Sequence, residues 1–367
     1  MLFLIHGYLA VPAGWKSRKE QFRLYFYLTM NKFYLKTILV CLLSFVGKSS
    51  YAYDCEIGGI FYRIDEREQT ASVTFLHYSS EDNKIAYTGV VSIPSSITYN
   101  SIVYPVTRIM SDAFRYCNSL TSVNIPNSVT DIGERAFEYC SSLVSVNIPN
   151  SVTYIGADAF RYCNSLTSII IPYSVTYIGT AALYGCNNLT EVILEDGNET
   201  LRFPGSGAFY KYSNDNNGTP LRNLYIGRNI NCIGGSPFRY LNTLSSVTFG
   251  SSVESIPSFE ECNSIKTVVS LIQDIYDIHS LTFPKAVYQN ATLYIPQGTL
   301  DKYKAANGWK EFYNIEDPTN ITSPNYIESV STETKRYTLD GKHIATPQRG
   351  INVVKMSDGT VKKVLVK

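Results

Sequence analysis

Cysteine and histidine are the side chains of this 367-residue chain best suited to nucleophilic or metal chemistry, and it has eight cysteines and four histidines. Such groups work together only at particular spacings, such as C-x-x-C or H-E-x-x-H. Neither spacing occurs, nor does a phosphate-binding loop or a G-x-S-x-G elbow. Pro204–Phe209 (PGSGAF) places Ser206 between glycines but lacks the flanking pattern of an elbow. The sequence therefore predicts a protein that is not an enzyme and needs no cofactor.

One polar stretch has the start of a calcium loop. In Ser213–Pro220 (SNDNNGTP), oxygen-bearing side chains alternate at Ser213, Asp215 and Asn217. A complete loop needs an acidic residue at its twelfth position, where Leu224 stands. We expect an ordinary solvated loop and no metal site.

Four cysteines recur at a constant interval of 23 residues, namely Cys117, Cys140, Cys163 and Cys186. Stacked repeats would bring their Cα atoms near disulfide range. The Cβ vectors of such a column run parallel, however, which favours buried thiols packed as small apolar groups. Scattered partial pairing is the alternative, and both interpretations make this a structural cysteine column.

The cysteines belong to a repeat that fills most of the chain. Its clearest copy is Ser119–Cys140 (SLTSVNIPNSVTDIGERAFEYC), and the leading leucine recurs as Leu120, Leu143, Leu166, Leu189, Leu221, Leu244 and Ile265. Repeats of this length stack into a solenoid in which each coil buries the apolar side chains of its neighbours. We therefore predict a β-rich solenoid of about 23-residue repeats. Two repeats carry about nine extra residues, at Ser95–Ile109 and at Ser213–Pro220, and both insertions are expected to emerge as loops.

Within a coil, the alternation of Val123, Asn124 and Ile125 predicts a short strand with its apolar side chains inward. Pro126 ends that strand, and Gly133 predicts a turn. Charges alternate between neighbouring coils in two columns: Asp112, Arg135 and Asp158, and then Arg115, Glu138 and Arg161. Opposite charges in successive coils would help to fix their register. The alternative is a solvated face of mixed charge.

The outward positions of the strands form the most informative column for binding. It contains Asn124, Asn147, Ile170, Ile193 and Tyr225, and so changes from polar to apolar along the chain. An aligned apolar patch is a natural anchor for a partner, and these five residues are our candidate partner-binding surface. The alternative is that the insertion between Leu189 and Leu221 covers this patch.

The chain is divided into six parts. Residues 1–29 are predicted to precede the true start at Met30, and residues 30–52 form a signal peptide cleaved after Ala52. An N-terminal β-hairpin cap occupies residues 53–87, and the solenoid with its C-terminal cap occupies 88–316, where Thr299 is expected to begin a short helix. A linker (317–335) precedes a small basic β tail (336–367).

Balanced charge limits the range of partners. With 32 basic and 31 acidic residues, the chain has no field that would favour nucleic acid. The apolar run of the signal is too short for a stable transmembrane span.

The repeat SLTSVNIPNSVTDIGERAFEYC and the final LYIPQGTLDKYKAANGW resemble the leucine-rich repeats of BspA-type bacterial surface proteins. The tail segments YTLDGK, RGINVVKMSDG and KKVLVK resemble C-terminal sorting signals of the type IX secretion system. These resemblances imply a protein that is secreted or displayed on the outer surface of a Gram-negative bacterium, with the secretion machinery as a partner of the tail. They further imply recognition of an extracellular protein or glycan, as in adhesion to host matrix or other cells. The alternative is a scaffold component of the envelope without a host ligand.

Overall fold

The computed structural model describes residues 53–75, 87–204, 207–209, 219–233 and 235–318, and in the tail 333–337, 343–344, 346, 350–356 and 361–366. Residues 1–29, the predicted signal at 30–52, His77, Ser206 and the calcium-like stretch at Ser213–Gly218 lie outside these residues. The predicted linker is described only at its two ends.

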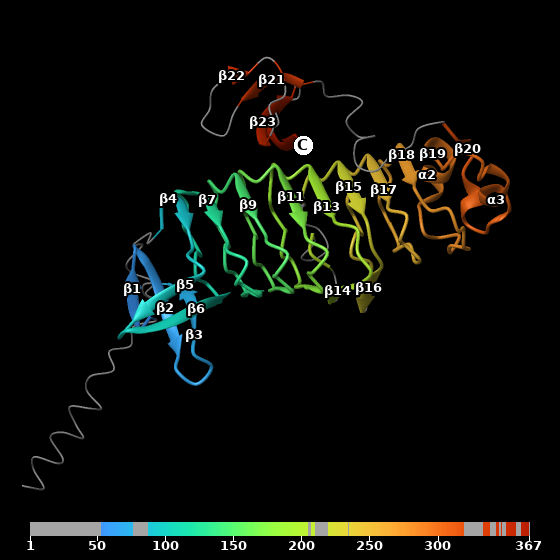
Figure 1. Ribbon diagram of the computed structural model, residues 1–367. Coiled ribbons are helices and arrows are strands. Elements are labelled where there is room, and N and C mark those ends of the chain that lie inside the picture. The colour runs from blue at the N-terminus through green and yellow to red at the C-terminus, as the bar shows by residue number, and fades with distance from the viewer. Residues whose placement is uncertain are drawn as a thin grey trace, which may run out of the picture. The chain divides into compact units, whose positions relative to one another are not determined.

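Successive repeats form stacked coils, and the first strand of each coil belongs to one face, which we call face 1 (Figure 1). Its strands pair in parallel within two sheets. The first contains β4 (Gly89–Ser92), β7 (Leu120–Asn124) and β9 (Ser145–Asn147). The second contains β11 (Ser168–Ile171), β13 (Glu191–Leu194), β15 (Asn223–Ile226), β17 (Ser246–Phe249), β18 (Thr267–Ser270), β19 (Thr292–Tyr294) and β20 (Asn314–Glu316).

The second strand of each coil builds the opposite side, which we call face 2. These strands are β6 (Ile102–Ile109), β8 (Asp131–Ile132), β10 (Tyr154–Ile155), β12 (Tyr177–Ile178), β14 (Leu201–Pro204) and β16 (Ile230–Ile233). Three of these strands, β8, β10 and β12, have only two residues, and the strands of face 2 also pair in parallel from one coil to the next. Both faces place alternate side chains in one shared core, as the period of two in each strand requires.

The front end differs from the sequence-based expectation in two ways. The cap is a meander of three antiparallel strands rather than a two-stranded hairpin: β1 (Cys55–Ile57), β2 (Ile60–Asp65) and β3 (Thr70–Thr74), with β3 joined in parallel to β6. The first insertion is a β-hairpin rather than a loop, because β5 (Ser96–Tyr99) pairs antiparallel with β6. Ile97 lies opposite Tyr104 and both are buried, so this hairpin extends the core.

Phenylalanine rings form a stack through the first coils. Phe114, Phe137 and Phe160 have no exposed surface, and their ring centroids are 5.0 and 5.2 Å apart in nearly parallel planes. This spacing is close to the distance between paired strands, so each ring rests on its equivalent in the next coil. The repeated phenylalanine of the sequence is thus a continuous column of the core.

Gly133 has a role different from the predicted turn. Its equivalents Gly156 and Gly179 lie in the same column, and each donates its N–H to the isoleucine carbonyl of the preceding coil at 2.8 Å. A Cβ atom on Gly156 would lie 2.5 Å from the backbone nitrogen of Glu134. Glycine is therefore required because two backbones approach each other closely here, and not because the chain turns.

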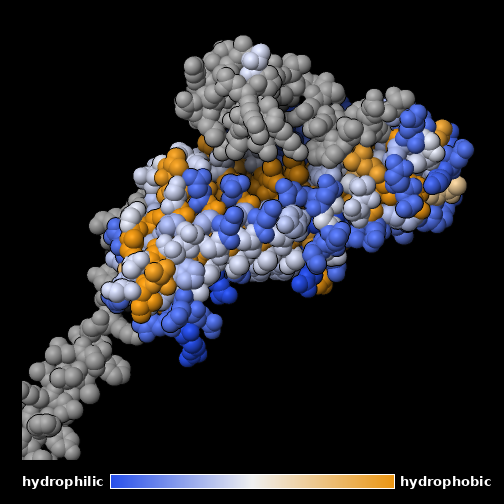
Figure 2. Space-filling model, in the orientation of Figure 1, coloured by the Kyte–Doolittle hydropathy of each residue, from blue (hydrophilic) through white to orange (hydrophobic). Residues whose placement is uncertain are grey.

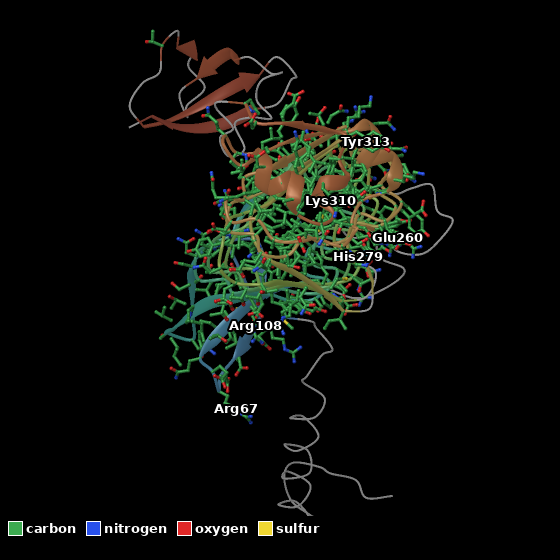
Figure 3. The ribbon with its side chains drawn as sticks, turned by 90° about the vertical axis from the view of Figure 1, so that its right-hand side faces the viewer. Arg67, Arg108, Glu260, His279, Lys310 and Tyr313 are labelled. Carbon is green, nitrogen blue, oxygen red and sulfur yellow. The ribbon has the colours of Figure 1, made fainter. Side chains whose placement is uncertain are left out.

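The back end closes with two short helices, α2 (Lys285–Asn290) and α3 (Leu300–Ala305), and a 3-10 turn, η1 (Trp309–Glu311). Figure 3 views this end, where Lys310 and Tyr313 are labelled. Trp309 is buried and its indole N–H donates to the Tyr276 carbonyl at 3.0 Å. Thr299 precedes α3, but its hydroxyl donates to the Pro296 carbonyl at 2.6 Å instead of capping the helix.

The tail forms an antiparallel sheet of its own in the order β22-β21-β23-β24. Its strands are β21 (Glu333–Tyr337), β22 (His343–Ile344), β23 (Gly350–Met356) and β24 (Val361–Val366). Among the described residues, no helix is both long and apolar enough to cross a bilayer.

Candidate recognition surface

Strand register places the candidate surface residues in one outward column of face 1. Asn124 pairs with Asn147 between β7 and β9. Ile170 pairs with Ile193, and Ile193 pairs with Tyr225, along β11, β13 and β15. The five residues thus occupy equivalent positions of five successive coils, and Thr248 and Val269 continue the column.

Exposure changes along this column. Asn124 and Asn147 are exposed, and the Asn124 amide donates to the Ser92 hydroxyl at 3.0 Å. Ile170 is 50% exposed and Ile193 is half-buried. Tyr225 is only 3% exposed. Figure 2 shows apolar side chains gathered on this side of the coils, in the region of β11 and β13.

A polar contact holds the tyrosine of this column. The Tyr225 hydroxyl donates to Asp196 Oδ1 at 2.8 Å. Asp196 lies between β13 and β14. Residues paired between neighbouring coils are 23 positions apart in the sequence before this segment (Ile170 with Ile193) and 25 positions apart after it (Tyr177 with Arg202). Two of the nine extra residues of this coil therefore lie beside the candidate surface.

Arg228 is the residue of this region that sequence analysis missed. It is completely buried, and its guanidinium donates to the carbonyls of Val175 and Pro172, both at 2.9 Å, and of Tyr173. Burial lowers the pKa of Arg228 to about 10, so it remains charged at neutral pH. The sequence signal is a lone arginine in a column whose other members are Asn127, Asn150, Tyr173, Asp196 and Ser251.

The neighbouring coils explain why an arginine is needed there. In regular coils a serine satisfies the valine carbonyl of the coil before it: Ser151 donates to Val129 at 2.7 Å and Ser174 to Val152 at 2.8 Å. The coil that follows Val175 carries the two extra residues, and the long side chain of Arg228 reaches across it to supply the donor. Arg228 thus stabilises the irregular coil that borders the candidate surface.

The predicted charge columns form contacts between coils. Glu138 is 2% exposed and lies between two arginines, 2.7 Å from Arg115 Nε and 3.1 Å from an Arg161 guanidinium nitrogen. Arg135 pairs with Asp112 at 3.1 Å. Beside these charges, the rings of Tyr116, Tyr139 and Tyr162 stack at 4.9 and 4.8 Å. Because Glu138 is nearly dry, this ion pair is screened less than a surface pair.

We expect Glu138→Gln to lower the free energy of unfolding by about 2 kcal/mol, because two partly buried arginines lose their shared counter-charge. Urea titration at low and high salt measures this change. Glu134→Gln is the matched control, since its side chain is 49% exposed and its one ion pair among the described residues is with Arg135 in the same coil. Equal small effects for both variants would contradict a stabilising role of the column.

The cysteine column is built from separate thiols. Cys117, Cys140, Cys163 and Cys186 are buried and unpaired. The thiols of Cys140, Cys163 and Cys186 each donate to the phenylalanine carbonyl of the preceding coil, at 2.9, 3.2 and 3.1 Å. Burial raises the pKa of the Cys186 thiol to about 12 and that of Cys163 well above its usual range.

The described residues contain no group of three or more His, Cys, Asp and Glu side chains that could hold a metal ion. His279, labelled in Figure 3, accepts a hydrogen bond at Nδ1 from the Leu281 N–H at 3.1 Å and so fixes its own turn.

Comparison with known proteins identifies the repeat. The family model of the BspA type leucine-rich repeat region, in six copies, matches residues 93–216 and 213–339. A comparison with curated proteins found no match.

Similar solved structures include three bacterial leucine-rich repeat proteins. The one from Bacteroides capillosus is 35% identical over 33% of this chain and 83% of its own, with a TM-score of 0.28. The one from T. pallidum is 20% identical over 73% of this chain and 100% of its own, with a TM-score of 0.40. The one from Bacteroides ovatus is 22% identical over 72% of this chain and 89% of its own, with a TM-score of 0.32. The family model covers well over half of the sequence, and the chain belongs to the BspA-type leucine-rich repeat family.

Proposed function

We propose that this protein is a non-catalytic recognition module that binds a partner through face 1. Leucine-rich repeats of this kind are in general binding scaffolds for proteins rather than enzymes. The observation that carries the proposal is the aligned outward column, in which exposed Asn124 and Asn147 adjoin the half-exposed apolar side chain of Ile170. An apolar anchor beside a polar border is the usual composition of a protein interface.

The chemistry of the column favours a protein ligand over a glycan. A sugar ring is bound best by an aromatic face, whereas the exposed and half-buried members of the column, Asn124, Asn147, Ile170 and Ile193, include no aromatic ring. Ile170 and Ile193 instead offer branched aliphatic surface, which packs against apolar side chains. The balanced charge of the chain also favours no strongly charged ligand.

We further propose that this recognition takes place outside the cell and serves adhesion. Its support is the predicted signal peptide at 30–52, the resemblance of residues 336–367 to a sorting tail, and the surface location typical of this repeat family. The secretion machinery is then the partner of the tail. Surface labelling of intact cells, with and without residues 336–367, tests this route, and equal labelling of both chains would contradict it.

Substitution of Ile170 tests the recognition surface. The mature chain is screened against extracellular matrix proteins, bacterial surface proteins and glycans, and the affinity for each saturable ligand is measured. We expect Ile170→Lys to weaken binding by about 30-fold, because a central apolar anchor contributes about 2 kcal/mol or more to an interface. Ile233→Lys is the control, since Ile233 is 69% exposed but lies in β16 on face 2.

Two outcomes would contradict the proposal. Equal loss of affinity in the Ile170 and Ile233 variants would move the binding site away from face 1. A lack of saturable binding to every protein and glycan, together with tight association with the envelope, would favour the scaffold alternative.

A further inference from the structure

Three side chains on face 1 are buried although they point away from the core. In β15, β17 and β18 the core positions are Leu224, Val247 and Val268, so the next residue of each strand points outward. These outward residues are Tyr225, Thr248 and Val269, and they are 3%, 4% and 1% exposed. At the equivalent outward position of β11, Ile170 is 50% exposed.

Neighbours within the same column do not explain this burial. Side chains beside one another in a sheet shield each other laterally, but each keeps its outer surface open to solvent unless a second layer covers it. Tyr225 is larger than its two neighbours in the column, Ile193 and Thr248, and cannot be hidden behind them, and its contact with Asp196 is made by its hydroxyl. Burial of three consecutive outward positions therefore requires a layer above β15, β17 and β18.

We propose that this layer is the chain's own C-terminal sheet, β21 to β24, and that it docks on the outward residues Tyr225, Thr248 and Val269. The chain supplies the necessary tether. Pro318 follows β20, the last strand of face 1, by two residues, and residues 319–332 separate it from β21. Strands of a sheet lie about 4.8 Å apart, which places β18 about 10 Å and β15 about 19 Å from β20. Fourteen extended residues span up to about 46 Å.

The tail has a complementary requirement. Its four strands form a single antiparallel layer, and β23 and β24 have sequences rich in branched apolar residues, GINVVKM and VKKVLV, with Ile351 opposite Leu365. A small sheet becomes stable when an apolar side packs on another layer. The tail can thus supply the layer that the burial on face 1 requires, and face 1 can supply the second layer that the tail requires.

This inference rests on the proposed function and adds regulation to it. The tail would occupy the C-terminal part of the recognition face and leave the exposed positions Asn124, Asn147 and Ile170 open. A ligand that needs the whole apolar column must then displace the tail, so the tail lowers the apparent affinity of the intact chain.

A cleavable tether tests the inference on the full, folded chain. A site-specific protease sequence is placed within residues 319–332, the chain is cut after folding, and gel filtration shows whether the tail fragment stays with the repeats. We expect the fragment to remain bound to the wild-type repeats and to be released at least ten times more readily by Val269→Lys. Asn147→Lys, which adds the same charge at an exposed position of the column, is the matched control and should not release it.

Hydroxyl-radical footprinting of Tyr225 gives a second measurement that needs no substitution in face 1. We expect Tyr225 to be protected in the intact chain and several-fold more reactive after the cut fragment has been diluted away. Free elution of the wild-type fragment, with unchanged Tyr225 reactivity, would overturn the inference. Protection that persists without the fragment and weakens on dilution of the protein would overturn it in favour of a second copy of the chain.

The ligand screen separates this inference from the proposed function. If removal of the tail exposes Tyr225 but no ligand binds, the docking stands and the recognition role fails. If a ligand binds the intact and the cut chain with equal affinity through Ile170, the recognition role stands and the docking fails.

Discussion

Gly156→Ala is expected to lower the free energy of unfolding by about 4 kcal/mol, a loss seen only when a substitution meets an obstacle that cannot move aside. The new methyl group would lie 2.5 Å from the Glu134 nitrogen and 2.7 Å from the Gly133 carbonyl carbon. Both atoms belong to the backbone of the preceding coil, so no side-chain rotation relieves the clash. The coils must separate, and the 2.8 Å hydrogen bond from Gly156 to Ile132 is lost. Urea titration measures the loss of stability.

Gly59→Ala is the control that separates the cost of a close approach between two backbones from the cost of an unfavourable backbone conformation. Gly59 has a φ of +76° and nothing lies within 4 Å of its Cβ position, so alanine there costs about 1–2 kcal/mol of conformational strain alone. Hydrogen exchange should also place the damage of Gly156→Ala in the coils on either side of it, because a solenoid is stabilised by nearest neighbours. Similar losses for the two variants, or exchange that is unchanged around Gly156, would contradict the role of the glycine column.

Arg228→Met should cost about 4 kcal/mol, because methionine fills a similar volume but leaves the carbonyls of Pro172, Tyr173 and Val175 buried without this donor. Each carbonyl was taken out of water on folding, and the desolvation cost remains when the hydrogen bond is removed. The effect should be concentrated between β12 and β16, where hydrogen exchange and urea titration together measure it.

Two further variants test this explanation. Arg222→Met removes the same charge from an exposed position just before β15 and should change stability by less than about 0.5 kcal/mol. Arg228→Lys keeps the charge but not the planar fork that serves several carbonyls, so an intermediate loss is expected. If lysine matched arginine, the charge itself and not the set of hydrogen bonds would be the important property.

The regular coils could be predicted because each of their features is repeated. Leu120 and Val123 recur in step with Pro126, and strands of period two with a fixed interval have only one register that keeps their apolar residues inside. The same repetition predicts Glu138 between Arg115 and Arg161, and the structure shows ion pairs with both. The family assignment agrees with this repeat at the level of the fold.

Features that depend on contact between coils were harder to predict. Gly133 has the sequence context of a turn, and only the stacked structure shows that a neighbouring backbone occupies the place of its side chain. Arg228 occurs once, and its partners lie more than fifty residues earlier, across a coil whose length is irregular. The insertion at Ser95–Ile109 contains the alternation of a strand pair, but its length alone suggested a loop. The role of the outward column as a binding surface remains a prediction.

Burial of the thiols connects folding of the coils with the redox chemistry of the cysteines. Thiol–disulfide exchange requires the thiolate, and burial raises the pKa of Cys140 and Cys163, which disfavours the thiolate form in the stacked coils. In the unfolded chain the same thiols have ordinary pKa values and are accessible, so an oxidising compartment can join them at random. In such a compartment, coil stacking and oxidation would therefore be in kinetic competition. A chain that stacks quickly would keep its cysteines reduced, whereas a slow one would collect disulfides formed in the unfolded state.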